Sequence, residues 1–316
     1  MKNVREIIIR DSPSQQIGIV SEWWRQIGIN AQKQPSIQEA REANELWQTL
    51  TAEPREVDYI ETEAGGIRAM WAVPKSCKQD RVILCFHGGG FFVGSMYTHR
   101  KMYAHLAKKV GCRALILDYS LVPEHVHPTQ VMECVNAYTW LLRQGIQPAH
   151  IAFAGDSAGG GLAVGTMLAL KDQGLPLPAA AVAVSPWFDM AGTGQSMIGN
   201  AGKDLIFNIS WIRSMGQMYV GQNGDPKDPQ ASPLYGDLTG LPPIYIHVGG
   251  DELLLDDSRR LADAADKAGI DVNVEIFPHM QHTFQMAAGR APEADHSLSL
   301  LADWLRISLK LHTFPL

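Results

Sequence analysis

Residues 151–161, IAFAGDSAGGG, join a short apolar run to a glycine-rich segment. The run 151–154 has the composition of a strand buried on both faces, and the residues from Ala158 onward have helical periodicity. A serine presented on the tight turn between them needs neighbours without Cβ atoms, and Gly155 and Gly159 meet that need. In this context G-x-S-x-G is typical of a nucleophile elbow, so the stretch predicts an α/β fold with Ser157 exposed at the end of a strand.

The same glycines also have a purely structural interpretation, in which Gly159, Gly160 and Gly161 let the helix and the strand pack closely. Each glycine inside a helix costs roughly 0.5–1 kcal/mol relative to alanine, and close packing alone leaves that cost unexplained. The turn also places Ser157 at a helix N-terminus, where the amide of Ala158 and the helix dipole favour negative charge. We therefore favour the nucleophile interpretation.

A second glycine run, HGGGF at residues 87–91, directly follows the apolar run 81–86. Glycines that leave a strand expose backbone amides, and such amides stabilise a developing oxyanion by a few kcal/mol each. A nucleotide-binding loop is the alternative, but neither glycine cluster reads G-x-G-x-x-G, and residues 89–95 lack the lysine of a P-loop. We predict that the amides of Gly88, Gly89 and Ala158 form an oxyanion hole.

A serine nucleophile needs a histidine base that is oriented by a carboxylate. His282 follows the predicted strand 272–277, and loops at the carboxyl ends of parallel strands line the site in such folds. His279, in the same loop, is the nearest rival. We predict His282 as the base.

The carboxylate is assigned to Asp251, which opens the loop after the predicted strand 243–248. Asp256 and Asp257 compete for this role, but they fit better as N-cap and first-turn acids of the next helix. The chain order Ser157, Asp251, His282 is the order of α/β-hydrolases, and it differs from the orders of chymotrypsin and subtilisin.

From about residue 57 onward, apolar runs rich in Val, Ile and Ala alternate with segments of helical period, as in βαβ units around a mostly parallel sheet. Strands are predicted at 57–62, 67–73, 81–86, 113–119, 151–154, 180–184, 243–248 and 272–277. Helices are predicted at 98–110, 129–143, 158–173, 257–268 and 293–311. Residues 1–52 and 188–236 fall outside the alternation, although a capping box at Ser36–Glu39 and an apolar stretch at 205–220 predict helix there.

The composition excludes several classes of protein. The 316 residues are 46% hydrophobic and 19% charged, which describes a globular chain rather than a disordered one. The net charge of -6 comes without a basic stripe, so we expect no nucleic-acid partner. No apolar run is long enough for a membrane helix, the N-terminus does not read as a secretory signal, and the four cysteines lack C-x-x-C spacing. We expect a cytoplasmic protein without integral membrane association.

Taken together, these motifs resemble the hormone-sensitive-lipase-like family of α/β-hydrolase esterases, in its bacterial branch. The H-G-G-G-F and G-D-S-A-G-G motifs stand in the family's order. Tyr119–His125 is similar to the family's Y-R-L-A-P-E-H block, and Ala231–Leu234 to its D-P-x-x-S-P-L region. Ser120 and Val122 depart from the usual Arg and Ala of that block.

The resemblance implies an α/β-hydrolase fold, with a mostly parallel eight-stranded sheet flanked by helices and a helical cap. The core would comprise residues 53–187 and 237–316, and the cap residues 1–52 and 188–236. A homodimer through the last strand is a further possibility. Aromatic and Met residues at helical spacing in the cap are most simply packing residues, but Phe207, Trp211 and Met215 are our candidates for substrate contacts.

The implied activity is hydrolysis of short- to medium-chain acyl esters through an acyl-enzyme, without metal or organic cofactor. An amidase or arylformamidase on the same triad is the alternative within enzymes. A non-catalytic ligand-binding protein on this fold is the alternative outside them, because a fold does not determine a function.

Overall fold

A computed structural model describes residues 4–6, 13–31, 33 and 35–311. Nine strands in these residues form one sheet, in the order β1-β9-β8-β7-β6-β4-β5-β3-β2. The strands are β1 (Val4–Glu6), β2 (Val57–Ala64), β3 (Ile67–Pro74), β4 (Lys78–Phe86), β5 (Cys112–Leu117), β6 (Ile151–Asp156), β7 (Ala180–Val184), β8 (Ile244–Gly249) and β9 (Val272–Phe277). Two of the pairings described are antiparallel, β2 with β3 and β3 with β5. The other pairings are parallel, so the sheet is mostly parallel.

All eight predicted strands are present, which confirms the predicted sheet, and β1 is a ninth that the sequence analysis missed. β1 is only three residues long and pairs parallel to β9, with Val4 opposite Val274. So short a strand carries no periodic signal. Its pairing covers the outer edge of β9, the strand through which we suggested a homodimer, and that dimer stays a prediction.

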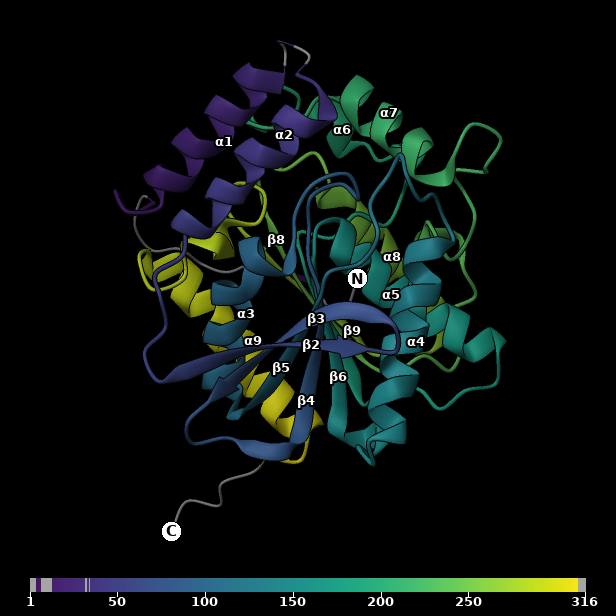
Figure 1. The fold of residues 1–316 in the computed structure, drawn as a ribbon. Coiled ribbons are helices and arrows are strands. Elements are labelled where there is room, and N and C mark those ends of the chain that lie inside the picture. Colours follow the sequence, from purple (N-terminus) through teal and green to yellow (C-terminus); the bar gives the residue numbers. More distant parts are fainter. Residues whose placement is uncertain (1–3, 7–12, 32, 34, 312–316) are drawn as a thin grey trace.

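The helices cover both faces of the sheet (Figure 1). They are α1 (Gly18–Ala31), α2 (Ile37–Asn44), α3 (Met96–Val110), α4 (Thr129–Arg143), α5 (Ala158–Asp172), α6 (Ser196–Gly199), α7 (Ile209–Val220), α8 (Leu255–Ala268) and α9 (Pro292–Ser308), with short 3₁₀ helices at Glu45–Thr49, Pro148–His150, Pro233–Tyr235 and Phe284–Ala287. α3 packs against α9 on one face, and α4 packs against α5 on the other. Each face therefore has its own apolar core.

Strand register places the carboxyl ends of the central strands at one edge. Phe86 of β4 is opposite Gly155 of β6, and Gly249 of β8 is opposite Phe277 of β9. The loops that follow these strands therefore meet, and they contain all the predicted catalytic residues.

Helices α1, α2, α6 and α7 lie together at this end of the molecule, and we call them the cap helices (Figure 1). The predicted capping box at the start of α2 is confirmed, because the Ser36 side chain accepts a hydrogen bond from the Glu39 amide and the Glu39 side chain accepts one from the Ser36 amide. The two cap segments touch, since a Cβ added at Gly28 of α1 would lie 2.6 Å from the carbonyl oxygen of Leu205. The segments predicted to lie outside the core alternation thus contribute helices to one layer.

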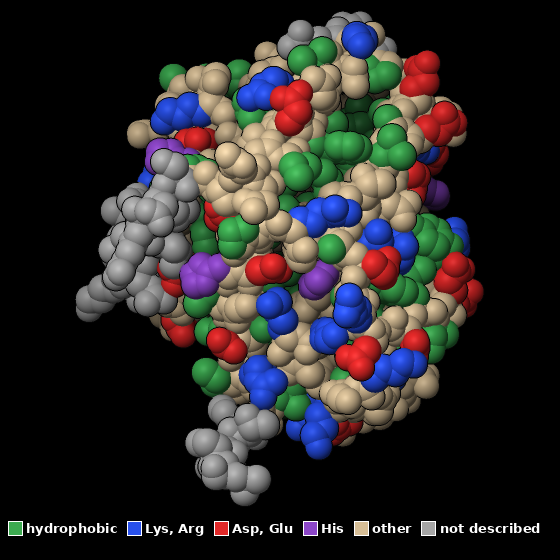
Figure 2. Space-filling view, turned by 90° about the vertical axis from the view of Figure 1, so that its left-hand side faces the viewer, with side chains coloured by type: hydrophobic (Ala, Val, Ile, Leu, Met, Phe, Trp, Pro, Cys, Tyr) green, Lys and Arg blue, Asp and Glu red, His purple; other side chains and the backbone are tan. Residues whose placement is uncertain are grey.

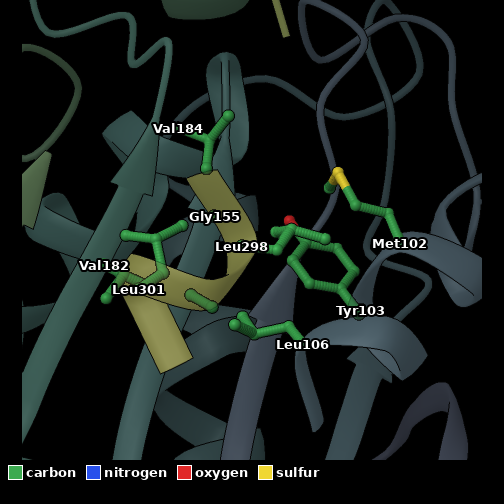
Figure 3. A pocket seen from close by; sticks show the side chains of 9 residues that line it. Met102, Tyr103, Leu106, Gly155, Val182, Val184, Leu298 and Leu301 are labelled. Carbon is green, nitrogen blue, oxygen red and sulfur yellow. The ribbon is translucent and has the colours of Figure 1, made fainter. Parts of the chain in front are cut away.

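A small apolar cavity lies between α3, α9 and the strands β6 and β7 (Figure 3). It is lined by Met102, Tyr103, Leu106, Ala154, Gly155, Val182, Val184, Leu298 and Leu301. Its lining is apolar, so it belongs to the packing of the core.

On the face drawn in Figure 2, basic side chains are interspersed with acidic ones. Ion pairs join Lys101 to Glu53 at 3.5 Å and Lys108 to Glu56 at 3.6 Å. In the described parts of the chain, no helix has the length and apolar character needed to cross a membrane. The cytoplasmic location and the lack of a nucleic-acid partner stay predictions.

Candidate active site

Ser157 lies on a strained turn between β6 and α5. Its φ of 53° is in the left-handed region, where a non-glycine residue costs about 1–3 kcal/mol. Four backbone hydrogen bonds hold the turn. The Ser157 amide donates to the Val184 carbonyl at 2.8 Å, and the Ser157 carbonyl accepts from the amides of Trp187 and Gly160 at 3.0 Å each and of Gly161 at 3.2 Å. The strain is therefore balanced by fixed contacts of the surrounding core.

The glycine spacing of the motif has a steric cause. A Cβ at Gly155 would lie 2.0 Å from the Gly159 carbonyl oxygen, and a Cβ at Gly159 would lie 1.9 Å from that of Phe86. Both approaches are far below van der Waals contact, so neither position accepts a side chain. This confirms the reason given for the G-x-S-x-G spacing.

The structure brings Ser157 and His282 together. His282 Nε2 lies 2.9 Å from Ser157 Oγ, and both side chains are buried. His279, the rival candidate, is exposed two residues after the end of β9. The serine hydroxyl can thus donate its proton to the imidazole, which is the geometry that a general base requires.

Glu252, and not Asp251, is the carboxylate partner of His282. Glu252 Oε2 lies 2.7 Å from His282 Nδ1, and its side chain is fully buried. Asp251 is half-buried and has no side-chain hydrogen bond to His282, so the prediction of Asp251 is wrong by one residue. The two acids are adjacent in a tight turn, and only the packing of that turn decides which carboxylate reaches the histidine.

The turn itself fixes the Glu252 carboxylate. Its Oε1 accepts hydrogen bonds from the Gly249 amide and from Ser185 Oγ, both at 2.6 Å. Ser185 Oγ in turn accepts a hydrogen bond from the Thr283 amide at 2.9 Å, next to His282. Ser185 therefore connects the acid and the base loops. Ser185 directly follows β7, at the same edge of the sheet as the catalytic loops. That position in the sequence could have indicated a role in the site.

The charge of Glu252 controls the protonation of His282. Burial alone would lower the pKa of the imidazole, but the charge of Glu252 and its hydrogen bond to Nδ1 outweigh burial and raise the pKa of His282 above its ordinary value. Because a carboxylate only accepts hydrogen bonds, Glu252 also holds the proton on Nδ1 and leaves Nε2 free to accept from Ser157.

The predicted role of Gly88 in the oxyanion hole is wrong. The Gly88 amide donates to Asp156 Oδ1 at 3.0 Å, and a Cβ at Gly88 would lie 2.3 Å from Asp156 Oδ2. An amide already bonded to a carboxylate does not serve a substrate oxygen. The sequence feature that could have indicated this is Asp156, the aspartate of the G-D-S-A-G motif. Its side chain reaches the neighbouring glycine loop and binds the Gly88 amide.

Asp156 anchors that loop to the core. It is fully buried, and besides the Gly88 amide it accepts a hydrogen bond from Tyr103 Oη at 2.7 Å and pairs with His99 Nε2 at 3.2 Å. Burial raises the pKa of Asp156, but the charge and hydrogen bond of His99 and the bond from Tyr103 outweigh it, and the pKa is lowered. The carboxylate thus stays ionised and holds the glycine loop beside Ser157.

Gly89, Gly90 and Ala158 offer the remaining amides. Among the described residues, none accepts a hydrogen bond from any of these three amides. Gly89 and Gly90 have φ values of 115° and 60°, a region that glycine occupies without strain. Gly89 and Ala158 therefore remain candidates for the oxyanion hole, and Gly90 joins them in place of Gly88.

Aromatic side chains of the second cap segment, from α7 and from the residues just before it, lie beside His282. The ring of Phe207 meets the ring of His282 edge-on at 4.9 Å, and Trp211 lies 5.4 Å from Phe207. Met215 of α7 covers the glycine loop, since its Sδ is 3.1 Å from the position of a Cβ at Gly90. All three predicted substrate contacts thus lie beside the site.

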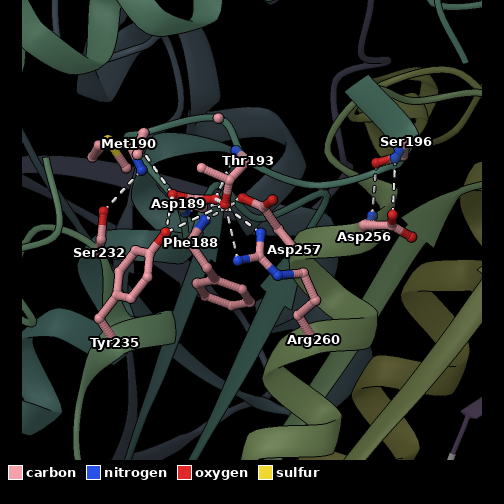
Figure 4. A network of polar contacts seen from close by, with 12 residues as sticks. Phe188, Asp189, Met190, Thr193, Ser196, Ser232, Tyr235, Asp256, Asp257 and Arg260 are labelled. Carbon is pink, nitrogen blue, oxygen red and sulfur yellow. Dashed lines mark hydrogen bonds and ion pairs between the residues drawn. The ribbon is translucent and has the colours of Figure 1, made fainter. Parts of the chain in front are cut away.

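Asp256 and Asp257 belong to the structural network drawn in Figure 4. Both lie in the first turn of α8, as predicted, although Leu254 and not Asp256 occupies the N-cap. Asp257 Oδ2 accepts from the Phe188 amide at 2.9 Å and the Asp189 amide at 3.0 Å. These contacts fix the segment that leads from β7 into the cap, so neither acid belongs to the catalytic arrangement.

Asp189 completes this network from the cap side. It accepts hydrogen bonds from Arg260 at 2.8 Å, Tyr235 at 3.0 Å and Thr193 Oγ at 2.6 Å (Figure 4). The start of the 188–236 segment is therefore bonded to α8, the helix that follows the Glu252 turn.

Elsewhere in the described ranges, no group of three or more His, Cys, Asp or Glu side chains is arranged to hold a metal ion. The side chains assembled here are a serine, a histidine and a carboxylate, together with the free amides of two glycine-rich turns. Such an arrangement is suited to nucleophilic attack on a carbonyl carbon.

A mostly parallel sheet with a serine elbow, a histidine and a carboxylate in the order Ser157, Glu252, His282 defines the α/β-hydrolase class. In agreement, residues 83–286 match the family model described as alpha/beta hydrolase fold. The chain belongs to this family, and within it to the hormone-sensitive-lipase-like esterases, as the following relatives show.

An acetyl-hydrolase of Streptomyces hygroscopicus is 38% identical over 291 residues, which cover 86% of this chain and 96% of the relative. An esterase of Acinetobacter venetianus is 36% identical over 224 residues, covering 71% of this chain and 74% of the relative. The crystal structure of an esterase from the bacterial hormone-sensitive lipase family superimposes with a TM-score of 0.90 at 39% identity, covering 95% of this chain and all of that one. The predicted family and the predicted enzyme class, a carboxylic ester hydrolase, are confirmed.

Proposed function

We propose that this enzyme hydrolyses carboxylic esters of short- to medium-chain acids through an acyl-enzyme formed on Ser157. The single observation that carries the proposal is the continuous contact from Ser157 Oγ to His282 Nε2 at 2.9 Å and from His282 Nδ1 to Glu252 at 2.7 Å. The substrate is a small acyl ester, and the proposed steps use the side chains and amides of this chain and one water molecule.

In the acylation step, Ser157 Oγ attacks the carbonyl carbon of the ester while His282 Nε2 takes the hydroxyl proton. The imidazolium formed is stabilised by the buried Glu252 carboxylate. The C–O bond to the alcohol then breaks, His282 returns the proton to the departing alcohol oxygen, and the acyl group remains on Ser157.

In the deacylation step, a water molecule takes the place of the alcohol. His282 removes a proton from this water as its oxygen attacks the acyl carbon, and then returns the proton to Ser157 Oγ as the acyl–serine bond breaks. The carboxylic acid leaves and the free enzyme is restored.

The amides of Gly89, Gly90 and Ala158 would receive the negative charge on the carbonyl oxygen in both steps. They come from the two turns that flank Ser157, and none has an acceptor among the described residues. Removal of one such donor in serine hydrolases costs about 10²–10³ in kcat, so these amides would supply a large part of the rate.

Met215 supports a preference for small acyl groups. Its Sδ lies against the Gly90 backbone, and its side chain is buried, so it limits the space next to the proposed oxyanion hole. Phe207 and Trp211 continue this apolar wall on the side of His282. The Streptomyces relative is an acetyl-hydrolase, which agrees with a small acyl site.

The direct test compares the enzyme with Ser157→Ala on p-nitrophenyl esters of increasing acyl length, with the matching p-nitroanilides in the same assay. We expect hydrolysis of the esters, a fall of kcat by about 10⁴-fold or more in the variant, and an unchanged circular dichroism spectrum. Stoichiometric labelling of Ser157 by a phosphonate ester, detected by mass spectrometry, should accompany activity. Faster turnover of the anilides would favour an amidase, and full activity of Ser157→Ala would refute the nucleophile.

A further inference from the structure

The loop that carries His282 receives a hydrogen bond from a cap helix. Trp24 of α1 donates its indole N–H to the carbonyl oxygen of His282 at 2.6 Å. The indole is fully buried, with no exposed surface at all. A contact made in the interior, without competing water, is fixed more firmly than the same contact at the surface.

Trp24 is itself held in place by its neighbours. Its ring packs edge-on against Trp47, with centroids 5.0 Å apart and an interplanar angle of 80°. One turn further along α1, Gly28 lies so close to the second cap segment that a Cβ there would be 2.6 Å from the Leu205 carbonyl oxygen. The donor therefore sits on a helix whose position is set by packing on both sides.

The His282 loop depends on such contacts because it has no regular backbone ladder of its own. Between the end of β9 and the next 3₁₀ helix, Thr283 has a φ of 46°, in the left-handed region. The imidazole must meet Ser157 and Glu252 at the same time, at 2.9 and 2.7 Å. A displacement of about 1 Å in such an arrangement can cost about a hundredfold in rate.

We propose that Trp24 is a positioning residue for the base: its indole N–H, bonded to the His282 carbonyl, holds the imidazole between Ser157 and Glu252. The inference rests on the proposed function, because it assigns a role within that same site. It makes the first cap segment part of the catalytic scaffold rather than only a cover over the substrate.

Other cap contacts on the same loops support this interpretation. The Gln281 side chain, next to His282, accepts from the Leu205 amide and donates to the Lys203 carbonyl, both at 3.0 Å. Asn200 Nδ2 donates to the carbonyl oxygen of Glu252 at 2.8 Å. The acid and the base are therefore both bonded to the cap through their own backbone carbonyls, and the base loop also through the side chain of Gln281.

The test removes the indole N–H and keeps an aromatic ring, by Trp24→Phe. The chain offers a matched control in Trp23→Phe, because the adjacent Trp23 is half-buried and its Nε1 has no hydrogen-bond partner among the described residues. Both variants and the parent enzyme are assayed on p-nitrophenyl acetate well below their melting temperatures. We expect kcat of Trp24→Phe to fall about 10- to 100-fold with KM within about twofold, and Trp23→Phe to stay within about twofold in both.

A second measurement reports the position of the imidazole without turnover. The proton between His282 Nδ1 and Glu252 should give a far-downfield NMR resonance, and we expect it to broaden or disappear in Trp24→Phe and persist in Trp23→Phe. A change in melting temperature alone, a change in KM alone, or equal losses in the two variants would overturn the proposal.

If Trp24→Phe does not fold, a benzothienylalanine at position 24 replaces only the N–H by sulfur and keeps the shape of the ring. The same loss of kcat is expected there, and unchanged kcat would overturn the proposal. Ser157→Ala is assayed alongside: an unaffected rate in that variant would refute the proposed function, whereas loss of activity there with full activity in Trp24→Phe would refute only the role of Trp24.

Discussion

Single residues in this site act through the partners that fix them. In the proposed mechanism, His282 works as a base because Glu252 determines which nitrogen carries the proton. Ser185 and the Gly249 amide hold the other oxygen of Glu252. Asp156 likewise holds the glycine loop in place, because its carboxylate accepts a hydrogen bond from the Gly88 amide. In each case, a side chain that touches no substrate determines where a reacting group lies.

The adjacent acids after β8 give the sharpest test at this scale. Glu252→Gln removes the charge that stabilises the imidazolium and can stabilise the wrong tautomer of His282, so we expect kcat/KM to fall about 10³- to 10⁴-fold. Asp251→Asn, one residue away, should leave kcat/KM within about twofold. Steady-state kinetics on one p-nitrophenyl ester decides between them, and the reverse order of effects would restore Asp251 as the acid.

The pH profile follows from the protonation of His282. Its pKa is raised by Glu252 above the ordinary value of 6.5, and only the neutral imidazole can accept the serine proton. Activity should therefore be lost as the pH falls through this raised pKa, with the midpoint of kcat/KM above 6.5. Measurement from pH 5 to pH 9 in buffers of constant ionic strength tests this, and a midpoint below the ordinary histidine value would contradict the effect of Glu252.

At the scale of elements, the cap helices and the strand-end loops form one unit. α1 bonds the His282 loop through Trp24, and the segment before α7 bonds it through Gln281. α7 also closes the apolar wall above the glycine loop. In the proposed function this part of α7 limits the space for the acyl group, so α7 would influence which substrates fit.

Shortening one side chain of α7 tests that role. Met215→Ala should open space beside Gly90, so we expect the ratio of kcat/KM for the hexanoate ester over the acetate ester to rise about tenfold. Met218→Ala, on the same helix but with 37% of its side chain exposed, should leave the ratio unchanged. An acyl-length series measured on both variants and the parent provides the comparison. Equal ratios in all three would remove Met215 from the acyl site.

For the whole molecule, stability depends on two apolar cores that meet across the sheet. The cavity between α3, α9, β6 and β7 is an unfilled part of the core (Figure 3). Its lining side chains come from α3 and β6 in the first half of the chain and from β7 and α9 in the second half. The packing around the cavity therefore depends on the two halves coming together.

Filling this cavity should stabilise the protein. Val182→Ile adds one methylene group from β7 into an apolar space, and we expect the free energy of unfolding to rise by about 0.5–1 kcal/mol. Val126→Ile, at a position that is 38% exposed, should change it by less than about 0.5 kcal/mol. Urea unfolding followed by circular dichroism measures both. A decrease for Val182→Ile would show that the cavity cannot accept the added group.

The sequence alone determined eight of the nine strands described, the serine elbow and the histidine. Buried parallel strands are nearly continuous apolar runs, and glycines at positions without room for a Cβ leave a local signature, so 151–161 and 272–282 could be interpreted directly. Only the tertiary structure decided between Asp251 and Glu252 as the partner of His282. It also showed that the Gly88 amide is bonded to Asp156 while that of Gly90 is a candidate for the oxyanion hole, and that Trp24 is bonded to the His282 carbonyl. Each of these depends on which atoms of distant segments come within hydrogen-bond distance, and no local pattern of residues contains that information.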